Sequence, residues 1–400
     1  MANKSQGSLR VILTLGTTET IAWASSYYLP AILARPIAAD LGLSPTWVFG
    51  ALTAALIFSG LIGPRVGHII DTVGGRGVHC ISNLVFAGGL AALAAATGPI
   101  SLGAAWVVLG IGMGMGLYDA AFATLTRIYG VAARKPITGI TLIAGFASTV
   151  GWPISAYLDA HFGWRIACLV WAATHILLAL PLNLTLPRAS ALPAAPKAAG
   201  DEAAGASSAS TAVEAKRERW AMAAVAYFFA TTGFVSAGIS AVLPTLLTQM
   251  GALPAAAILA GALVGPSQVA ARLVEAGWLS RYHPLVSTEL ATIMAPLGVV
   301  ALVLGGPAFG PLFAIFYGGG NGILTISRGT LPLALFGAEG FGRRVGILSL
   351  PARGTAAIAP LVMGLLVEYG TAALWACVIV SLSALLALLL LHAKHREARA

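Results

Sequence analysis

Residues 17–33 read TTETIAWASSYYLPAIL, and residues 231–247 read TTGFVSAGISAVLPTLL. Both stretches carry a Thr-Thr pair and then a Leu-Pro pair at an identical spacing. Each lies in an apolar run long enough for a helix that crosses a hydrocarbon core of ~30 Å, which needs about 20 residues. The recurrence indicates that one membrane-helix unit occurs twice in the chain.

Further matches between the two parts of the chain support this repeat. They occur in the same order, Gly63-Pro64 with Gly265-Pro266 and Pro153 with Pro360. Repeats of this kind place a substrate site near the middle of the membrane, where the two copies face each other. Access to that site then alternates as one copy rocks against the other.

The composition excludes a soluble enzyme. Of the 400 residues, 58% are hydrophobic and only 9% are charged, and the mean hydropathy is +0.88. In soluble domains about a quarter of all residues are charged, and these residues cover the water-facing surface. A membrane β-barrel is excluded as well, because its segments alternate in polarity over about 10 residues and these runs do not.

The apolar runs predict an all-α membrane protein with twelve transmembrane helices in two six-helix pseudo-repeats around a central cavity. We expect a six-helix bundle over residues 1–186, a flexible cytoplasmic linker over 187–219 and a second bundle with a short cytoplasmic tail over 220–400. The linker is rich in Ala, Ser, Pro and mixed charge, which cannot bury enough surface to fold alone. The predicted spans are 11–34, 44–64, 78–97, 101–126, 136–160, 165–186, 220–247, 254–278, 285–305, 309–332, 345–368 and 371–391.

The net charge of +9 comes from short basic clusters between the apolar runs. Most of these clusters fall on one side if both termini are cytoplasmic, as expected for a bacterial inner-membrane protein. Because the clusters are scattered, we expect no nucleic-acid partner. The cysteines, Cys80, Cys168 and Cys377, form no metal-binding or disulfide pattern, so we expect neither metal nor cofactor, and a monomer in the lipid bilayer.

The loop after the second span reads GHIIDTVGGRG over residues 67–77. Its Gly67, Asp71, Gly74 and Arg76 fit the pattern G-x-x-x-D-x-x-G-x-R/K. This loop resembles the signature of the major facilitator superfamily. The resemblance covers the whole chain as six helices, a linker and six helices, and it implies transport of a small molecule.

This loop is also a candidate gate on physical grounds. An Asp beside a helix terminus and an Arg across the same face can form a charge-assisted contact that holds one state and breaks when the halves rock. The alternative is that the loop needs its two glycines only for a tight turn and its polar residues only for contact with water.

Two of the carboxyl groups inside predicted spans, Glu19 and Asp119, are candidates for proton coupling. Glu19 lies about 12 Å from the start of its helix, at 1.5 Å per residue, with Trp23 and Tyr27 on the same stripe. A carboxyl in such surroundings can take up and release a proton. Asp119 follows a glycine-rich run that permits close helix packing. We expect both to carry the coupling proton; the alternatives are a permanent ion pair or a polar tie between helices.

Three arginines also fall inside apolar runs: Arg272, Arg328 and Arg353. A guanidinium is suited to bidentate capture of a carboxylate, which predicts an anionic substrate. The places of Arg272 and Arg353, on the eighth and eleventh helices, faintly resemble those of the cationic groups in monocarboxylate and oxalate-type carriers. The alternative is that these arginines pair internally with Glu19, Asp119 and Glu275, and that Glu275 pairs with Arg272 or belongs to a gate.

Asn321, with Thr325 and Arg328, forms one polar face of the tenth helix, which we expect to line the cavity. Trp23 and Tyr27 add aromatic walls that suit a planar ring. The alternative for the aromatic residues is packing or anchoring at the membrane interface.

These observations predict a secondary active transporter that moves a small organic anion with protons. The sequence contains no ATP-binding P-loop. One alternative is a proton-antiport exporter of drugs or toxic metalloids, and another is a carrier of an aromatic, vitamin-like solute. A receptor that uses the same fold without transport is a further alternative. An enzyme is not expected, because no nucleophile with a paired base is evident.

Overall fold

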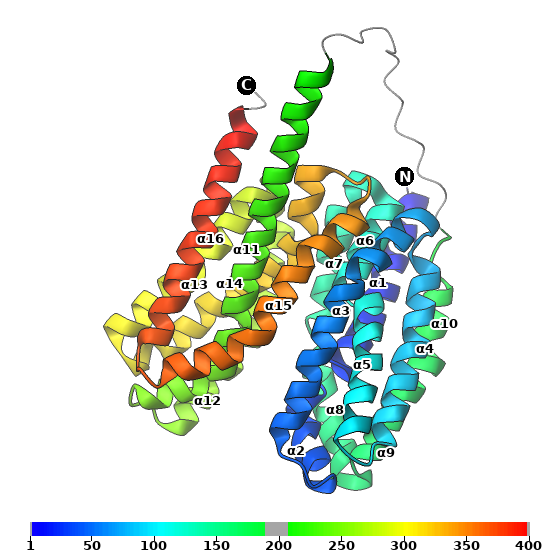
Figure 1. The fold of residues 1–400 in the computed structure, drawn as a ribbon, viewed down its shortest axis with the longest axis vertical. Coiled ribbons are helices and arrows are strands. Elements are labelled where there is room, and N and C mark those ends of the chain that lie inside the picture. The colour runs from blue at the N-terminus through cyan, green and yellow to red at the C-terminus, as the bar shows by residue number, and fades with distance from the viewer. Residues whose placement is uncertain (1, 189–206, 398–400) are drawn as a thin grey trace.

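The computed structural model describes residues 2–188 and 207–397, and almost all of them are helical (Figure 1). The all-helical class predicted from the sequence is confirmed. The helices are α1 Ala2–Ser25, α2 Pro30–Asp40, α3 Pro45–Val73, α4 Gly75–Ala94, α5 Pro99–Gly116, α6 Tyr118–Tyr129, η1 Gly130–Ala133, α7 Arg134–Ala144, α8 Ala147–Phe162, α9 Trp164–Thr174, η2 His175–Ala179, α10 Leu180–Leu184, α11 Ser207–Gln249, α12 Pro254–Gly277, η3 Leu279–Arg281, α13 Pro284–Gly305, η4 Pro307–Phe309, α14 Gly310–Phe336, α15 Phe341–Val367 and α16 Ala372–Glu397.

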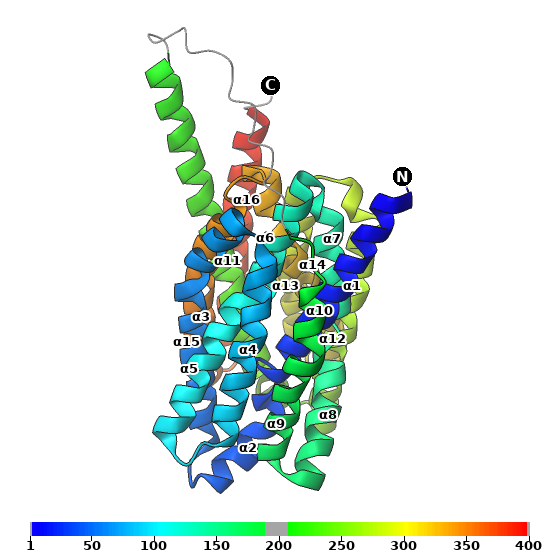
Figure 2. The same cartoon turned by 90° about the vertical axis from the view of Figure 1, so that its right-hand side faces the viewer.

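The helices form two groups that stand side by side (Figure 1). We call α1–α10 the first group and α11–α16 the second group. Figures 1 and 2 both show α1 beginning and α16 ending at the same end of the molecule, at the top of each view. The turn between α3 and α4 lies at this end too, and we call it the terminal face.

The chain crosses the membrane many times. Among the described residues, ten helical segments are long and apolar enough to span a bilayer. The longest of these segments, Pro99–Phe162, contains α5 to α8 and is therefore longer than one crossing requires. Large apolar side chains are exposed along the helices, as a lipid-facing surface requires.

Three of the predicted spans in the first group are interrupted. The first divides between Ser25 and Pro30, because Pro30 has no N–H to donate into the preceding turn. The run predicted at 101–126 divides at Leu117, whose backbone is extended with φ −101° and ψ −178°. The run predicted at 136–160 divides between Ala144 and Ala147. Apolarity alone did not reveal these breaks.

The two groups meet toward the terminal face. One buried apolar cluster draws Val11, Ile70 and Ile137 from the first group together with Phe341 and Val345 from the second. Two other large clusters lie toward the opposite end, and each stays within one group. The packing therefore joins the groups at the terminal face.

The second group begins earlier than the sequence predicted. The flexible linker was expected to end at residue 219, but α11 begins at Ser207. The stretch before Trp220 is rich in Ala, Glu, Lys and Arg, which favour a helix and extend the membrane span beyond the bundle. Its Glu218 pairs with Arg344 of α15 at 2.9 Å. Residues 189–206 of the predicted linker lie outside the described residues.

Candidate functional site

Arg353 connects the two groups at the middle of the molecule. Its Nη2 lies 2.7 Å from Oδ2 of Asp119 on α6, and its Nη1 donates to Oγ of Ser59 on α3 at 2.7 Å. Gly60 lies against the Arg353 side chain, so that α3 and α15 approach closely. The Arg353 and Asp119 side chains are 18% and 17% exposed. They are therefore within reach of a solute.

The break at Leu117 positions Asp119. α6 begins at Tyr118, so Asp119 lies in the first turn of a helix that starts within the apolar interior. The positive end of a helix dipole favours a carboxylate at that place. The glycine-rich run before it has the predicted role, because Gly112 and Gly116 pack against Phe86 of α4. Ser59, which holds the other side of Arg353, was not identified from the sequence.

Glu19 is nearly fully buried, with 1% of its surface exposed. Trp23, one turn later on α1, donates from Nε1 to Oε2 of Glu19 at 3.1 Å. The other oxygen, Oε1, has no hydrogen-bond partner among the described residues. Asp119 on the adjacent helix α6 is close enough to interact electrostatically with Glu19. The structure thus brings together the two carboxyl groups that the sequence selected.

Arg328 stands apart from the other interior arginines. Its guanidinium forms no hydrogen bond or ion pair with any residue that the structure describes. Asp119, Arg353 and Tyr27 nevertheless lie close enough for electrostatic interaction with it. An unpaired guanidinium in an apolar interior is costly, and it is available to a ligand.

Arg272 has a full set of partners. Its Nη1 donates to the carbonyl oxygen of Thr141 at 2.8 Å, near the end of α7, and its Nη2 donates to Gln268 at 3.3 Å. It is therefore a contact between the two groups. Glu275 is not its partner: Glu275 Oε1 pairs with Arg134 Nη2 at 3.1 Å, again across the groups. The predicted pair with Arg272 is therefore wrong, and a gate role for Glu275 stays a prediction.

The interior charges are consequently unbalanced. Because Glu275 pairs with Arg134, the residues that remain near the middle are Arg272, Arg328 and Arg353 against Glu19 and Asp119. Three cations against two carboxylates leave one positive charge when all are ionised. The sequence alone had left the balance near neutral.

Asn321 lies away from this cluster. It borders a cavity of ≈20 Å³ inside the second group, large enough for about one water molecule. Thr232, Thr292 and Ser381 line the same cavity. The polar face predicted on α14 is therefore divided, with Asn321 toward the interior of its own group and Arg328 toward Asp119.

Aromatic side chains cover the break between α1 and α2. The Trp23 ring lies 5.3 Å from that of Tyr27 and 5.1 Å from that of Tyr118, and Tyr28 lies 6.1 Å from Trp152. Tyr27 is 37% exposed, so part of the cluster is accessible. Sequence reasoning missed Tyr28 and Trp152. Pro30, two residues after Tyr28, was the available signal for a break.

The last turns of α3 contact the start of α15. Residues 67–73, expected in a loop, are helical, and only Gly74 separates α3 from α4. Asp71 accepts hydrogen bonds from the backbone N–H groups of Gly342 at 2.8 Å and Arg343 at 2.9 Å. These donors belong to the first turn of α15, where a helix has unsatisfied N–H groups and favours an anion. Gly67 contacts Gly342 backbone to backbone.

The remaining two residues of the predicted gate have different roles. Gly74 adopts a positive φ of 90° in the turn, which an L side chain would strain. Arg76 forms no hydrogen bond or ion pair within the described part of the chain. The partner of Asp71 is thus a helix terminus and not a guanidinium.

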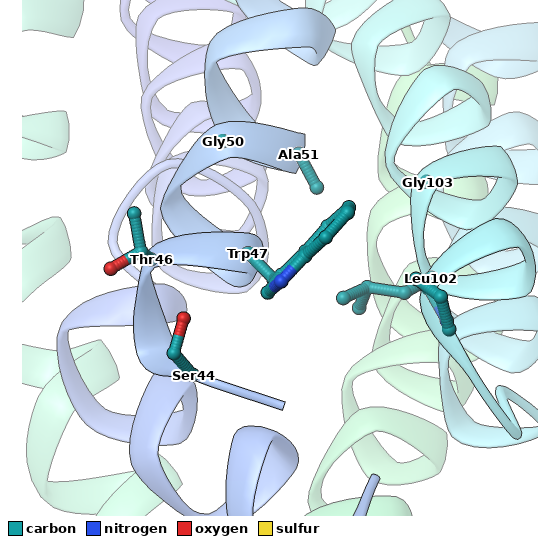
Figure 3. A pocket seen from close by; sticks show the side chains of 8 residues that line it. Ser44, Thr46, Trp47, Gly50, Ala51, Leu102 and Gly103 are labelled. Atoms are coloured by element: carbon teal, nitrogen blue, oxygen red, sulfur yellow. The ribbon is translucent and has the colours of Figure 1, made fainter. Parts of the chain in front are cut away.

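A larger cavity lies elsewhere. It has a volume of ≈380 Å³ between the beginnings of α3 and α5, at the end opposite the terminal face. Figure 3 shows the Trp47 ring between Ala51 and Leu102 at this cavity. Its lining is mostly apolar and contains none of the interior charged residues. No cluster that could hold a metal ion occurs in residues 2–188 and 207–397.

Comparison with known proteins identifies relatives of this architecture. The family model described as Major Facilitator Superfamily matches residues 16–339. No curated protein matches the sequence at a significant level. Three solved structures superpose over 96% of this chain. The first is the human organic anion transporter MFSD10 (TETRAN), with 16% sequence identity, 99% of that chain covered and a TM-score of 0.70. The second is the proton:xylose symporter XylE bound to 6-bromo-6-deoxy-D-glucose, with 15% sequence identity, 95% of that chain covered and a TM-score of 0.70. The third is the transporter FucP in the outward conformation, with 16% sequence identity, 98% of that chain covered and a TM-score of 0.69.

Proposed function

Because the chain belongs to the Major Facilitator Superfamily, a family of transporters and not of enzymes, we propose that it is a proton-coupled secondary transporter for a small organic anion. It works by alternating access between its two groups of helices. Twelve spans in two six-helix repeats, residues 1–186 and the helices from α11 onward, surround the route. The protein acts as a monomer in the bacterial inner membrane, with the terminal face in the cytoplasm.

The observation that carries the anion proposal is the unpaired guanidinium of Arg328. It lies near the Arg353–Asp119 pair, where the interior charges sum to one excess positive charge. A carboxylate bound between Arg328 and Arg353 neutralises that charge and supplies the missing hydrogen bonds. Arg272 contributes from the edge of the site, because its donors already bind Thr141 and Gln268.

The proton proposal rests on Glu19 and Asp119. Glu19 Oε1 is buried and receives no hydrogen bond from the described residues, so protonation at this oxygen removes the cost of an ionised carboxylate oxygen that has no donor. When the proton binds, the excess positive charge of the interior rises by one, which favours the incoming anion. Proton and anion therefore favour each other's binding, as a symporter requires.

The position of the contacts supports an outward-facing state. Asp71 with the start of α15, Arg134 with Glu275 and Arg353 with Asp119 join the groups from the terminal face to the middle. With the terminal face cytoplasmic, the route to Arg328 is closed from the cytoplasm. Rocking then has to break the contacts of Asp71 and Glu275 before the anion is released inside.

A second observation favours a ring-bearing anion. Trp23, Tyr27 and Tyr118 form a partly exposed aromatic surface beside the carboxyl groups. Aromatic surfaces of this kind suit planar substrates. The substrate that these features describe best is an aromatic carboxylate.

The test is a screen of the purified protein for thermal stabilisation, because a ligand that binds the folded state raises its melting temperature. The panel contains aromatic and aliphatic carboxylates, neutral sugars and cationic drugs at two pH values. We expect equal stabilisation by carboxylates in the wild type and in Arg35→Ala, whose arginine is exposed on α2, and a smaller stabilisation at the same ligand concentration in Arg328→Ala. Stabilisation by cationic drugs alone would contradict the proposal and favour an exporter.

A further inference from the structure

The first group contains a buried network of polar side chains that the proposed transport does not use. Each of its members is 5% exposed or less. They come from α1, α4, α6, η2 and α10, and within a bundle packed mostly from apolar residues each needs a polar partner. The members are Thr18, Ser25, His79, Asn83, Thr124, His175 and Asn183.

His175 is the centre of the network. Its Nδ1 lies 2.8 Å from Oδ1 of Asn83 and its Nε2 lies 2.8 Å from Oγ of Ser25. Because Asn83 donates from Nδ2 to the His79 carbonyl at 2.8 Å, its Oδ1 is the acceptor, and Nδ1 of His175 carries the proton. Nε2 then accepts from Ser25. Phe86 stacks on the ring at 4.8 Å and fixes its plane.

A second layer of the network reaches α6. Thr18 donates to Oδ1 of Asn183 at 3.2 Å, and Asn183 donates to the His79 carbonyl at 3.5 Å. The Nε2 atom of His79 lies 3.0 Å from Oγ1 of Thr124, which itself donates to Ala120. The network thus connects α1 to α6 through α4 and α10.

The π-helical turn explains why both layers face α1. His175 and Asn183 are eight residues apart, which in an α-helix places them roughly 80° apart around the axis. The turn η2, His175–Ala179, takes up about one extra residue and reduces the difference to roughly 20°. Both side chains can then face α1 and α4.

The network holds α1 on both sides of Glu19. Thr18 immediately precedes Glu19, and Ser25 is the last residue of α1, so the two anchors lie about two turns apart on one face. Thr124 lies on the same short helix as Asp119. The helices that carry the two carboxyl groups are therefore fixed relative to each other by side chains that contact neither carboxyl.

We propose that His175 is a positioning residue: through Ser25 and Asn83 it holds α1 in the rotation that presents Glu19 to Asp119. The inference deepens the proposed function, because it assigns control of the proton site to a residue outside that site. Glu19 faces Trp23 on its own helix and Asp119 and Tyr118 on α6, and Arg353 of α15 and Arg328 of α14 act on Asp119. The network contains one other titratable group, His79.

Glu19 can be followed without a substrate. The full-length protein in phosphatidylcholine–phosphatidylglycerol vesicles is titrated with acid, and infrared spectroscopy records the carbonyl stretch of protonated carboxyl groups. Glu19→Gln identifies the band that belongs to Glu19. We expect His175→Leu to displace the midpoint of this band by about one pH unit, a tenfold change in proton affinity. His175→Gln restores the wild-type midpoint, because an amide can donate to Asn83 and accept from Ser25.

The matched control is His161→Leu, since His161 is exposed on α8 and its hydrogen-bond and ring partners among the described residues are Tyr157 and Phe162 of the same helix. We expect the wild-type midpoint there. An unchanged midpoint in His175→Leu would overturn the inference, as would a displaced midpoint in His175→Gln. If His175→Leu does not fold, Ser25→Ala replaces it, and an unchanged midpoint in that variant has the same meaning. Uptake assays test the proposed function separately. If His175→Leu displaces the midpoint of the Glu19 band but the wild-type protein transports no carboxylate, the proposed carboxylate transport is refuted and the positioning role of His175 is not.

Discussion

Arg353 and Asp119 form an ion pair of 2.7 Å whose two members belong to different groups of helices. The pair lies at the level where α6 begins, and Ser59 holds the guanidinium from a third helix. When one group rocks against the other, this pair has to break or move as a unit. In the proposed transporter it therefore links the site proposed for the anion to the change of conformation.

Arg353→Ala is expected to abolish anion binding and to destabilise the fold. It leaves Asp119 unpaired in the interior, at a cost of about 3 kcal/mol, the lower end of the range for buried pairs, because both side chains keep some contact with solvent. Unfolding by denaturant in detergent measures this cost. The double variant Arg353→Ala with Asp119→Asn is expected to recover most of the stability but not the binding. If the double variant is no more stable than Arg353→Ala, the pair is not the cause.

Arg328→Ala is expected to leave stability within about 0.5 kcal/mol of the wild type, or to raise it, because removal of this interior cation breaks no hydrogen bond or ion pair with the described residues. Affinity for the anion falls by about tenfold to a hundredfold, the loss of one charge-assisted hydrogen bond of about 1.5–3 kcal/mol. Isothermal titration calorimetry checks the affinity. Arg328→Lys keeps the charge and is expected to lose less. Equal affinity in Arg328→Ala and the wild type would place the anion elsewhere.

Glu19→Gln is expected to separate exchange from uphill transport. The amide keeps the acceptor for Trp23 Nε1 but cannot release a proton. Exchange of labelled for unlabelled anion across proteoliposomes continues, while accumulation driven by a pH gradient is lost. The control is Glu368→Gln, at the end of α15 and exposed. Accumulation that persists in Glu19→Gln would assign the proton to another group.

Asp71→Ala is expected to shift the protein away from the state described here. The carboxylate contributes two charge-assisted hydrogen bonds, together about 3–6 kcal/mol. A change of about 5.5 kcal/mol converts a 99:1 population into 1:99. Spin labels are placed in two pairs, Arg76→Cys with Arg343→Cys and Lys135→Cys with Arg343→Cys, in a background without the native cysteines. The distance within each pair reports the separation of the two groups at the terminal face. We expect longer distances in Asp71→Ala and no change in Asp159→Asn, at the far end of α8.

The sequence predicted the helical class and most helix positions because membrane spans are set by length and apolarity, which are properties of a single run. It also selected Glu19, Asp119, Arg328 and Arg353, because charge is rare in such runs. It did not predict which arginine would stay unpaired. That outcome depends on Arg134 reaching Glu275 from a distant part of the chain.

The missed residues have a common cause. Ser59 and His175 are not unusual residues for their stretches of sequence. Their importance comes from their partners in the fold, Arg353 for Ser59 and Ser25 for His175. The π-helical turn at His175 has no signature in the apolar pattern, because it changes the direction of side chains and not their polarity. Breaks such as that at Leu117 are set by packing between helices.

At two points between the Arg353 and Asp71 contacts, α3 and α15 meet glycine backbone against glycine backbone, Gly63 with Gly346 and Gly67 with Gly342. No side chain of one helix interlocks with the other at these points. Separating the two helices at these points therefore requires no change of side-chain rotamer and withdraws no side chain from a pocket on the other helix. Such a contact can break and re-form repeatedly with the same geometry, which suits an interface that opens and closes in each transport cycle.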